Sequence, residues 1–153
     1  MKSFSGYLVR TLLILSFILR SEESDAMLSL NSDNFQEILS QSNFLVVEFY
    51  SLGCPHCQDF APVYESLESK ISKELPNVKV GKVDVDAEGQ LANQYDIARI
   101  PRILLFSKQK SEPVVFKGSR TEPLLLAWIK QEINYSEQGF FLQLTNKKLQ
   151  TRK

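Results

Sequence analysis

Residues 49–62 read FYSLGCPHCQDFAP and carry both cysteines of the chain, Cys54 and Cys57, with its one histidine, His56, between them. A disulfide between these cysteines would close a loop around two residues only, and the entropic stabilisation by a disulfide falls as its loop shortens. Stability is therefore a poor reason for the pair, and redox chemistry is a better one. A C-x-x-C pair beside a strand–helix pattern is a specific indication of thiol–disulfide exchange.

The segments around this motif alternate between strand and helix patterns. Residues 43–51 form a continuous apolar run of strand length, typical of a strand buried on both faces. Residues 55–75 carry apolar side chains at helical spacing, and we expect Pro62 to kink that helix. The other predicted elements are helices over 30–41, 88–97 and 121–133 and strands over 77–86, 102–106 and 113–116. This order predicts an α/β fold with a central mixed β-sheet flanked by helices.

Cys54 falls at the junction between the predicted strand and the predicted helix. Pro55 suits the first helical position, which makes Cys54 the N-cap residue. Free N–H groups and the positive end of the helix dipole favour a thiolate there, and the thiolate is the nucleophile. Cys57, one turn later and deeper, is suited to attack the mixed disulfide. A zinc site would need about four ligands, more than this motif supplies, so we expect no metal.

The ends of the chain have their own character. A basic start followed by a short apolar run predicts a signal peptide over residues 1–26, and this run is about half the length of a membrane span. Residues 27–135 form one predicted domain, and residues 136–153 read as a polar, basic tail. The formal net charge is zero, so nothing indicates a nucleic-acid partner, and we expect a monomer. Asn134 begins the one N-x-S/T sequon, whose glycosylation the sequence leaves open.

Three segments resemble the thioredoxin superfamily, and specifically a single catalytic domain of protein disulfide isomerase. They read LVVEFYSLGCPHCQDFAPVYESLE, GKVDVDAEGQLANQYDIARIPRILLF and FKGSRTEPLLLAWI, in the order of that family. The similarity covers about residues 28–134. It implies a thioredoxin fold and a redox-active disulfide between Cys54 and Cys57.

The resemblance also implies roles for matching residues. Glu48 matches a buried acid that relays a proton to and from the resolving cysteine, and Lys82 matches the lysine that pairs with it. Ile100 and Pro101 match the cis-proline loop that presents backbone to the substrate, and Arg120 matches an arginine that stabilises the Cys57 thiolate. Independently, a carboxylate in an apolar strand needs a partner or a raised pKa.

Three positions depart from the isomerase pattern. Gly53 stands where that pattern has a tryptophan facing the substrate, and Pro55 stands where it has a glycine. Arg102 follows the cis-proline position in place of the usual threonine. We expect Arg102 and His56 to lie near Cys54, where positive charge stabilises the thiolate and raises oxidising power.

The sequence thus predicts a thiol–disulfide oxidoreductase that forms or isomerises disulfides in cysteine-containing proteins, without a cofactor. Glutathione or a thiol oxidase would exchange electrons with it. The alternative is a client-binding or chaperone module of the same fold, in which redox turnover is secondary. The expected location is the secretory pathway, in the lumen of the endoplasmic reticulum. Secretion is also open, because the chain ends in QTRK without a KDEL-type retrieval sequence.

Overall fold

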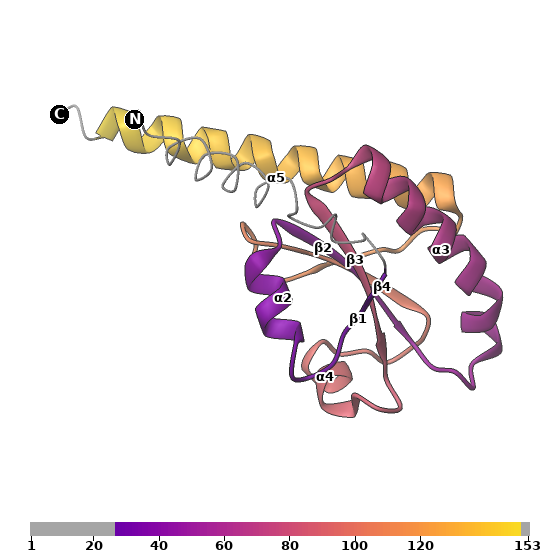
Figure 1. Cartoon of the computed structure of the whole chain (residues 1–153). Helices are drawn as coiled ribbons and strands as arrows, with labels where there is room; N and C mark the ends of the chain where they lie inside the picture. The colour runs from indigo at the N-terminus through magenta and orange to yellow at the C-terminus, as the bar shows by residue number, and fades with distance from the viewer. Residues whose placement is uncertain (1–26, 151–153) are drawn as a thin grey trace, which may run out of the picture.

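A computed structural model gives the fold of residues 27–150 (Figure 1). Five strands form one mixed sheet in the order β1-β3-β2-β4-β5. The strands are β1 (Leu28–Ser29), β2 (Phe44–Tyr50), β3 (Val78–Asp84), β4 (Arg102–Ser107) and β5 (Val114–Val115). The helices are α2 (Phe35–Gln41), α3 (Pro55–Glu74), α4 (Gly89–Gln94) and α5 (Glu122–Gln150). The predicted fold class, a mixed β-sheet flanked by helices, is confirmed.

β2 lies at the centre of the sheet because its side chains are apolar on both faces. Every residue of β2 except Tyr50 is buried. β3 pairs with it in parallel and β4 in antiparallel orientation. Because parallel strands end at the same edge of a sheet, the end of β2, which leads to Cys54, lies beside the end of β3.

Successive β2 side chains point into two separate core layers. One layer lies under α3 and α5, and the other lies under α2 and α4. The first layer is built from Phe44, Val46, Phe60, Tyr64, Leu67, Ile71, Val78, Val80, Ile103, Leu105, Leu125 and Ile129. The second layer is built from Leu30, Phe35, Leu45, Val47, Phe49, Val83, Leu91, Leu104 and Phe106. The sheet is therefore held between helices on both faces.

The last helix differs from the prediction. We expected it to end near residue 133 and to be followed by a frayed tail, but α5 continues to Gln150 and extends past the sheet (Figure 1). Residues 136–150 contain no proline, and most are good helix formers such as leucine, glutamine and lysine. The helix propensity of these residues accounts for the longer helix, whereas the prediction of a tail considered only that the segment is polar.

The signal peptide and the sequon were the other features predicted near the ends of the chain. The predicted signal peptide lies outside the described residues. No helix within residues 27–150 is both long and apolar enough to cross a membrane. Asn134 is exposed on α5, whereas Ser136 of the same sequon is buried.

Candidate redox site

Cys54 is the N-cap residue of α3, and Pro55 begins the helix. Its backbone is extended (φ −90°, ψ 113°), so the chain turns from the loop after β2 into the helix at this residue. The N–H of Cys57 donates a hydrogen bond to Cys54 Sγ over 3.3 Å. The half-buried sulfur thus lies at the positive end of α3, where an anion is stabilised. Cys54 is also the more exposed of the two cysteines.

Cys57 lies one turn further along α3 and is buried, with 3% of its surface exposed. Burial, aided by a hydrogen bond with the Cys54 side chain, raises the pKa of the Cys57 thiol to about 11. Cys57 therefore holds its proton at neutral pH. Its sulfur can attack a mixed disulfide only after a base removes that proton.

Glu48 is the one acid in β2, and only 4% of its surface is exposed. Its Oε1 atom is buried without a hydrogen-bond partner in the described chain. Burial raises the pKa of Glu48 to about 7, against the opposing positive charges of Lys82 and Arg120. A carboxyl group with this pKa can accept and release a proton at neutral pH.

Lys82 is the register partner of Glu48 on the neighbouring strand β3. Its Nζ lies over the ring of Tyr50, 5.4 Å from the ring centroid. The ion pairs found within residues 27–150 do not include Glu48 or Lys82. Lys82 therefore acts on the carboxyl group through its charge, and the direct pairing expected from the resemblance is not formed.

A cavity of about 150 Å³ joins these groups. It is lined by Met27, Glu48, Tyr50, Ser51, Leu52, Cys57, Gln58, Ala61, Tyr64, Glu65 and Lys82. Glu48 and Lys82 supply polar groups to this cavity, and its volume is large enough to hold water. The structure thus brings the predicted acid, lysine and resolving cysteine to one space beside the helix start.

The other predicted residues surround this arrangement less closely. The Ile100–Pro101 peptide bond is cis, as the resemblance implied, and Pro101 is buried. Arg102 begins β4 opposite Phe49 and is half-buried, and His56 is exposed in the first turn of α3. Neither side chain forms an ion pair or a side-chain hydrogen bond with the site residues inside the described range.

Arg120 and Gly53 are also exposed. Arg120 reaches the site only through the effect of its charge on Glu48. At Gly53, an added Cβ would meet only the Ser51 hydroxyl, 3.8 Å away. The backbone at Gly53 therefore has room for a Cβ atom.

Sequence reasoning missed the residues that hold the loop before Cys54. The Ser51 hydroxyl donates to Asp86 Oδ2 over 2.6 Å and accepts a hydrogen bond from the Gly53 N–H over 3.2 Å. Gln58 Nε2 donates to the Leu52 carbonyl over 2.7 Å. A serine at the end of a buried strand is a weak indication of such a role, because its partner lies 35 residues away.

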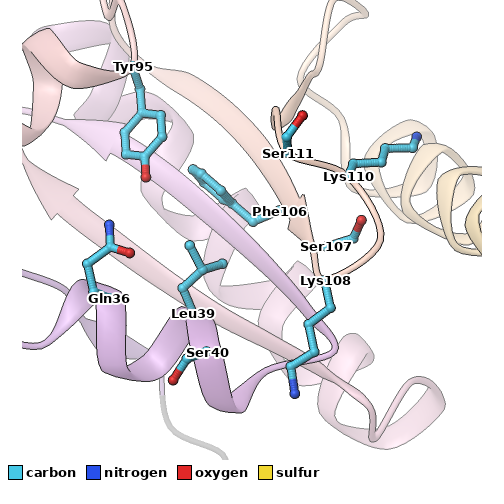
Figure 2. Close-up of a pocket in the computed structure, with 9 residues that line it drawn as sticks. All are labelled: Gln36, Leu39, Ser40, Tyr95, Phe106, Ser107, Lys108, Lys110 and Ser111. Carbon is cyan, nitrogen blue, oxygen red and sulfur yellow. The ribbon is translucent and has the colours of Figure 1, made fainter.

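A second pocket lies apart from these residues (Figure 2). Its volume is about 310 Å³, and Tyr95, Leu39 and Phe106 form its apolar part. Gln36, Ser40, Ser107, Lys108, Lys110 and Ser111 complete its lining. None of the predicted site residues takes part in it. Across residues 27–150, no three His, Cys, Asp or Glu side chains are grouped to hold a metal ion.

Comparison with known proteins defines the class to which this fold and dithiol belong. The Thioredoxin family model matches residues 26–131. The first thioredoxin domain of mouse protein disulfide-isomerase A4 superimposes with a TM-score of 0.65 at 30% identity, covering 72% of this chain and 77% of that domain. The chain therefore belongs to the thioredoxin superfamily. Within it, the chain is a protein disulfide isomerase-like single domain.

Relatives of full length point to the same branch. Bovine protein disulfide-isomerase A4 is 32% identical over 113 residues, and the Drosophila melanogaster protein disulfide-isomerase A6 homolog is 33% identical over 136 residues. These matches cover 74% and 84% of this chain, but only 17% and 30% of the relatives. The zinc-bound form of human ERp44 has a TM-score of 0.64 at 29% identity, over 69% of this chain and 29% of that one. The chain thus spans less than a third of these larger proteins.

Proposed function

We propose that this protein is a thiol–disulfide oxidoreductase that forms or isomerises disulfides in protein substrates of the secretory pathway. The observation that carries the proposal is the pairing of two unlike cysteines. Cys54 Sγ accepts a hydrogen bond at the start of α3, whereas Cys57 is buried beside a carboxyl group with a pKa of about 7. One sulfur is placed to attack and the other to be activated by a base.

We propose two successive thiol–disulfide exchange steps. The Cys54 thiolate attacks one sulfur of a client disulfide, forms a mixed disulfide and releases the other client sulfur as a thiolate. Glu48 takes the proton of Cys57 through water in the cavity. The Cys57 sulfur then attacks Cys54 Sγ and releases the second client sulfur. The protein loses two electrons to the client, and the reverse sequence oxidises a client dithiol.

Several residues support these steps in the proposal. Lys82 and Arg120 keep the pKa of Glu48 from rising further, because their charges favour its ionised form. The cis Pro101 presents backbone to the client. Arg102 adds positive charge that favours the reduced protein and raises its oxidising power, and His56 does so in its protonated form. Glutathione or a thiol oxidase serves as the electron partner, in the lumen of the endoplasmic reticulum.

The experiment compares the wild type with a Cys54→Ser, Cys57→Ser double variant. A ribonuclease with scrambled disulfides is refolded in glutathione buffer, and recovered ribonuclease activity is followed over time. We expect the wild type to accelerate recovery at least about tenfold and the double variant to give the buffer rate. If the double variant matches the wild type, the function is client binding without redox turnover.

A further inference from the structure

Leu52 lies two residues before Cys54, and 71% of its surface is exposed. In the described part of the chain, the other large exposed hydrophobic residues are Leu124, Tyr135, Phe141 and Leu142, all on α5. A single exposed leucine is common on a protein surface and indicates nothing by itself. Leu52 differs because it adjoins the nucleophilic sulfur and because its backbone is held in place.

Hydrogen bonds fix the backbone on both sides of Leu52. Its own carbonyl accepts from Gln58 Nε2 over 2.7 Å. Before it, the Ser51 hydroxyl binds Asp86 Oδ2 over 2.6 Å, and after it, the Gly53 N–H donates to the same hydroxyl over 3.2 Å. A loop that is already fixed loses little conformational entropy when it binds a partner. More of the free energy gained by burying its side chain therefore contributes to affinity.

The surroundings of Leu52 leave room for a partner side chain. Leu52 lines the 150 Å³ cavity together with Met27 and Ala61. On its other side Gly53 has no side chain, and a Cβ there would approach only Ser51 Oγ at 3.8 Å. The residues next to Leu52 in the loop are uncharged. The exposed side chain of Leu52 therefore has open space and apolar neighbours beside it, while the charged groups of the cavity, Glu48, Glu65 and Lys82, line the same space.

We propose that Leu52 is a specificity-determining contact, which packs against an apolar side chain next to the client cysteine that Cys54 attacks. The inference rests on the proposed disulfide exchange. Two extended residues span at most about 7 Å, and adjacent Cα atoms of a client lie 3.8 Å apart, so a neighbour of the client cysteine can reach Leu52. The occupant is a polypeptide segment with a leucine-like residue beside its cysteine.

Two peptides that differ in one residue test this contact. Each is a short neutral peptide with one cysteine, joined to a second copy of itself by a disulfide, with either leucine or serine beside the cysteine. Reduced protein converts each dimer to two peptide thiols, and acid quenching followed by alkylation counts the remaining protein thiols. The leucine-to-serine rate ratio is compared in the wild type, in Leu52→Ser and in Leu124→Ser. The last variant alters a leucine on α5 that is 51% exposed.

We expect the wild type and Leu124→Ser to prefer the leucine peptide about fivefold, and Leu52→Ser to show a ratio near one. Partial burial of one leucine side chain supplies a preference of this size. General damage to the loop would slow both peptides equally and leave the ratio unchanged. A wild-type ratio near one, or a ratio that survives Leu52→Ser, overturns the role of Leu52 while disulfide exchange stands. If the wild type reduces neither peptide, the proposed function fails and this inference fails with it.

Discussion

The two faces of β2 show how stability and chemistry are divided within one strand. On the face toward α2 and α4, the strand is apolar to Phe49, which is fully buried and packs against Tyr95 at a ring-centroid distance of 6.1 Å. On the face toward α3 and α5, apolar Val46 is followed by Glu48, which is nearly as buried and has an unpartnered carboxyl oxygen. At this end of the strand, one face therefore carries the apolar ring of Phe49 and the other carries the carboxyl group of Glu48.

The difference shows where the protein gives up stability. Burial of the ionised Glu48 carboxylate destabilises the folded state, and this appears as its pKa of about 7. The cavity beside Glu48 also removes packing around this carboxyl group. Local features that break packing rules are expected at functional sites, where they serve chemistry. Three substitutions test the comparison through stability.

The largest effect is expected on the apolar face. Phe35 is fully buried, and its ring lies 5.4 Å from the Phe106 centroid and 5.5 Å from the Tyr95 centroid. Phe35→Ala should lower the free energy of unfolding by about 3–5 kcal/mol, because the substitution leaves a cavity in a packed layer. Urea unfolding followed by circular dichroism measures the loss. A loss below about 1 kcal/mol would show that this face is not the main source of stability.

The next effect has the opposite sign. Because the pKa of Glu48 in the folded protein lies above its ordinary value, ionisation weakens the fold as pH rises from about 4.5 to 7. Glu48→Gln removes that charge and should stabilise the reduced protein by about 2–3 kcal/mol at pH 8. The gain should fall below about 1 kcal/mol at pH 5 and vanish below about pH 4, where Glu48 is protonated in both states.

Urea unfolding of reduced protein at pH 5 and pH 8 measures this gain. The matched control is Glu65→Gln, which alters an exposed glutamate of α3 and should change stability by less than about 0.5 kcal/mol at either pH. An equal effect of Glu48→Gln at both pH values would refute buried ionisation as its cause.

A smaller effect is expected at Tyr64, a polar side chain on the α3 side of the sheet that has a hydrogen-bond partner. The hydroxyl of Tyr64 is fully buried and donates to the Gly81 carbonyl over 2.9 Å. Tyr64→Phe should destabilise by about 1 kcal/mol, the usual contribution of one buried hydrogen bond, with no dependence on pH between 5 and 8. The same unfolding series measures it. A pH-dependent loss would mean that Tyr64 and Glu48 act as one unit.

Much of this division could be predicted from the sequence. The apolar run over residues 43–51 identified β2 and made Glu48 conspicuous within it. The order Cys-Pro-His-Cys placed Cys54 at the helix start and Cys57 one turn deeper, because proline suits the first helical position. These inferences held because they depend on local backbone preference and on one strand pattern.

The parts that could not be predicted depend on contacts distant in sequence or on weak preferences. Ser51 and Asp86 meet across two strand ends, and no local pattern pairs them. The resemblance implied that Lys82 pairs with Glu48, but the ammonium group of Lys82 lies over the ring of Tyr50. This depends on the side-chain conformation of Lys82, which the sequence does not specify. The continuation of α5 to Gln150 follows from helix propensity in a segment whose polar composition indicated a tail.

The most direct test of the account is the rate at which Cys57 resolves the mixed disulfide. Reduced protein is mixed with saturating peptide disulfide from pH 5 to 9, and release of the second peptide thiol is followed in the wild type and in Glu48→Gln. With Glu48 as the base, the wild-type rate should rise to a plateau with a midpoint near pH 7. Glu48→Gln should be at least about tenfold slower at pH 7 and should accelerate steadily with pH, since the pKa of Cys57 is about 11. Equal rates and the same midpoint in both proteins would contradict the claim that Glu48 activates Cys57.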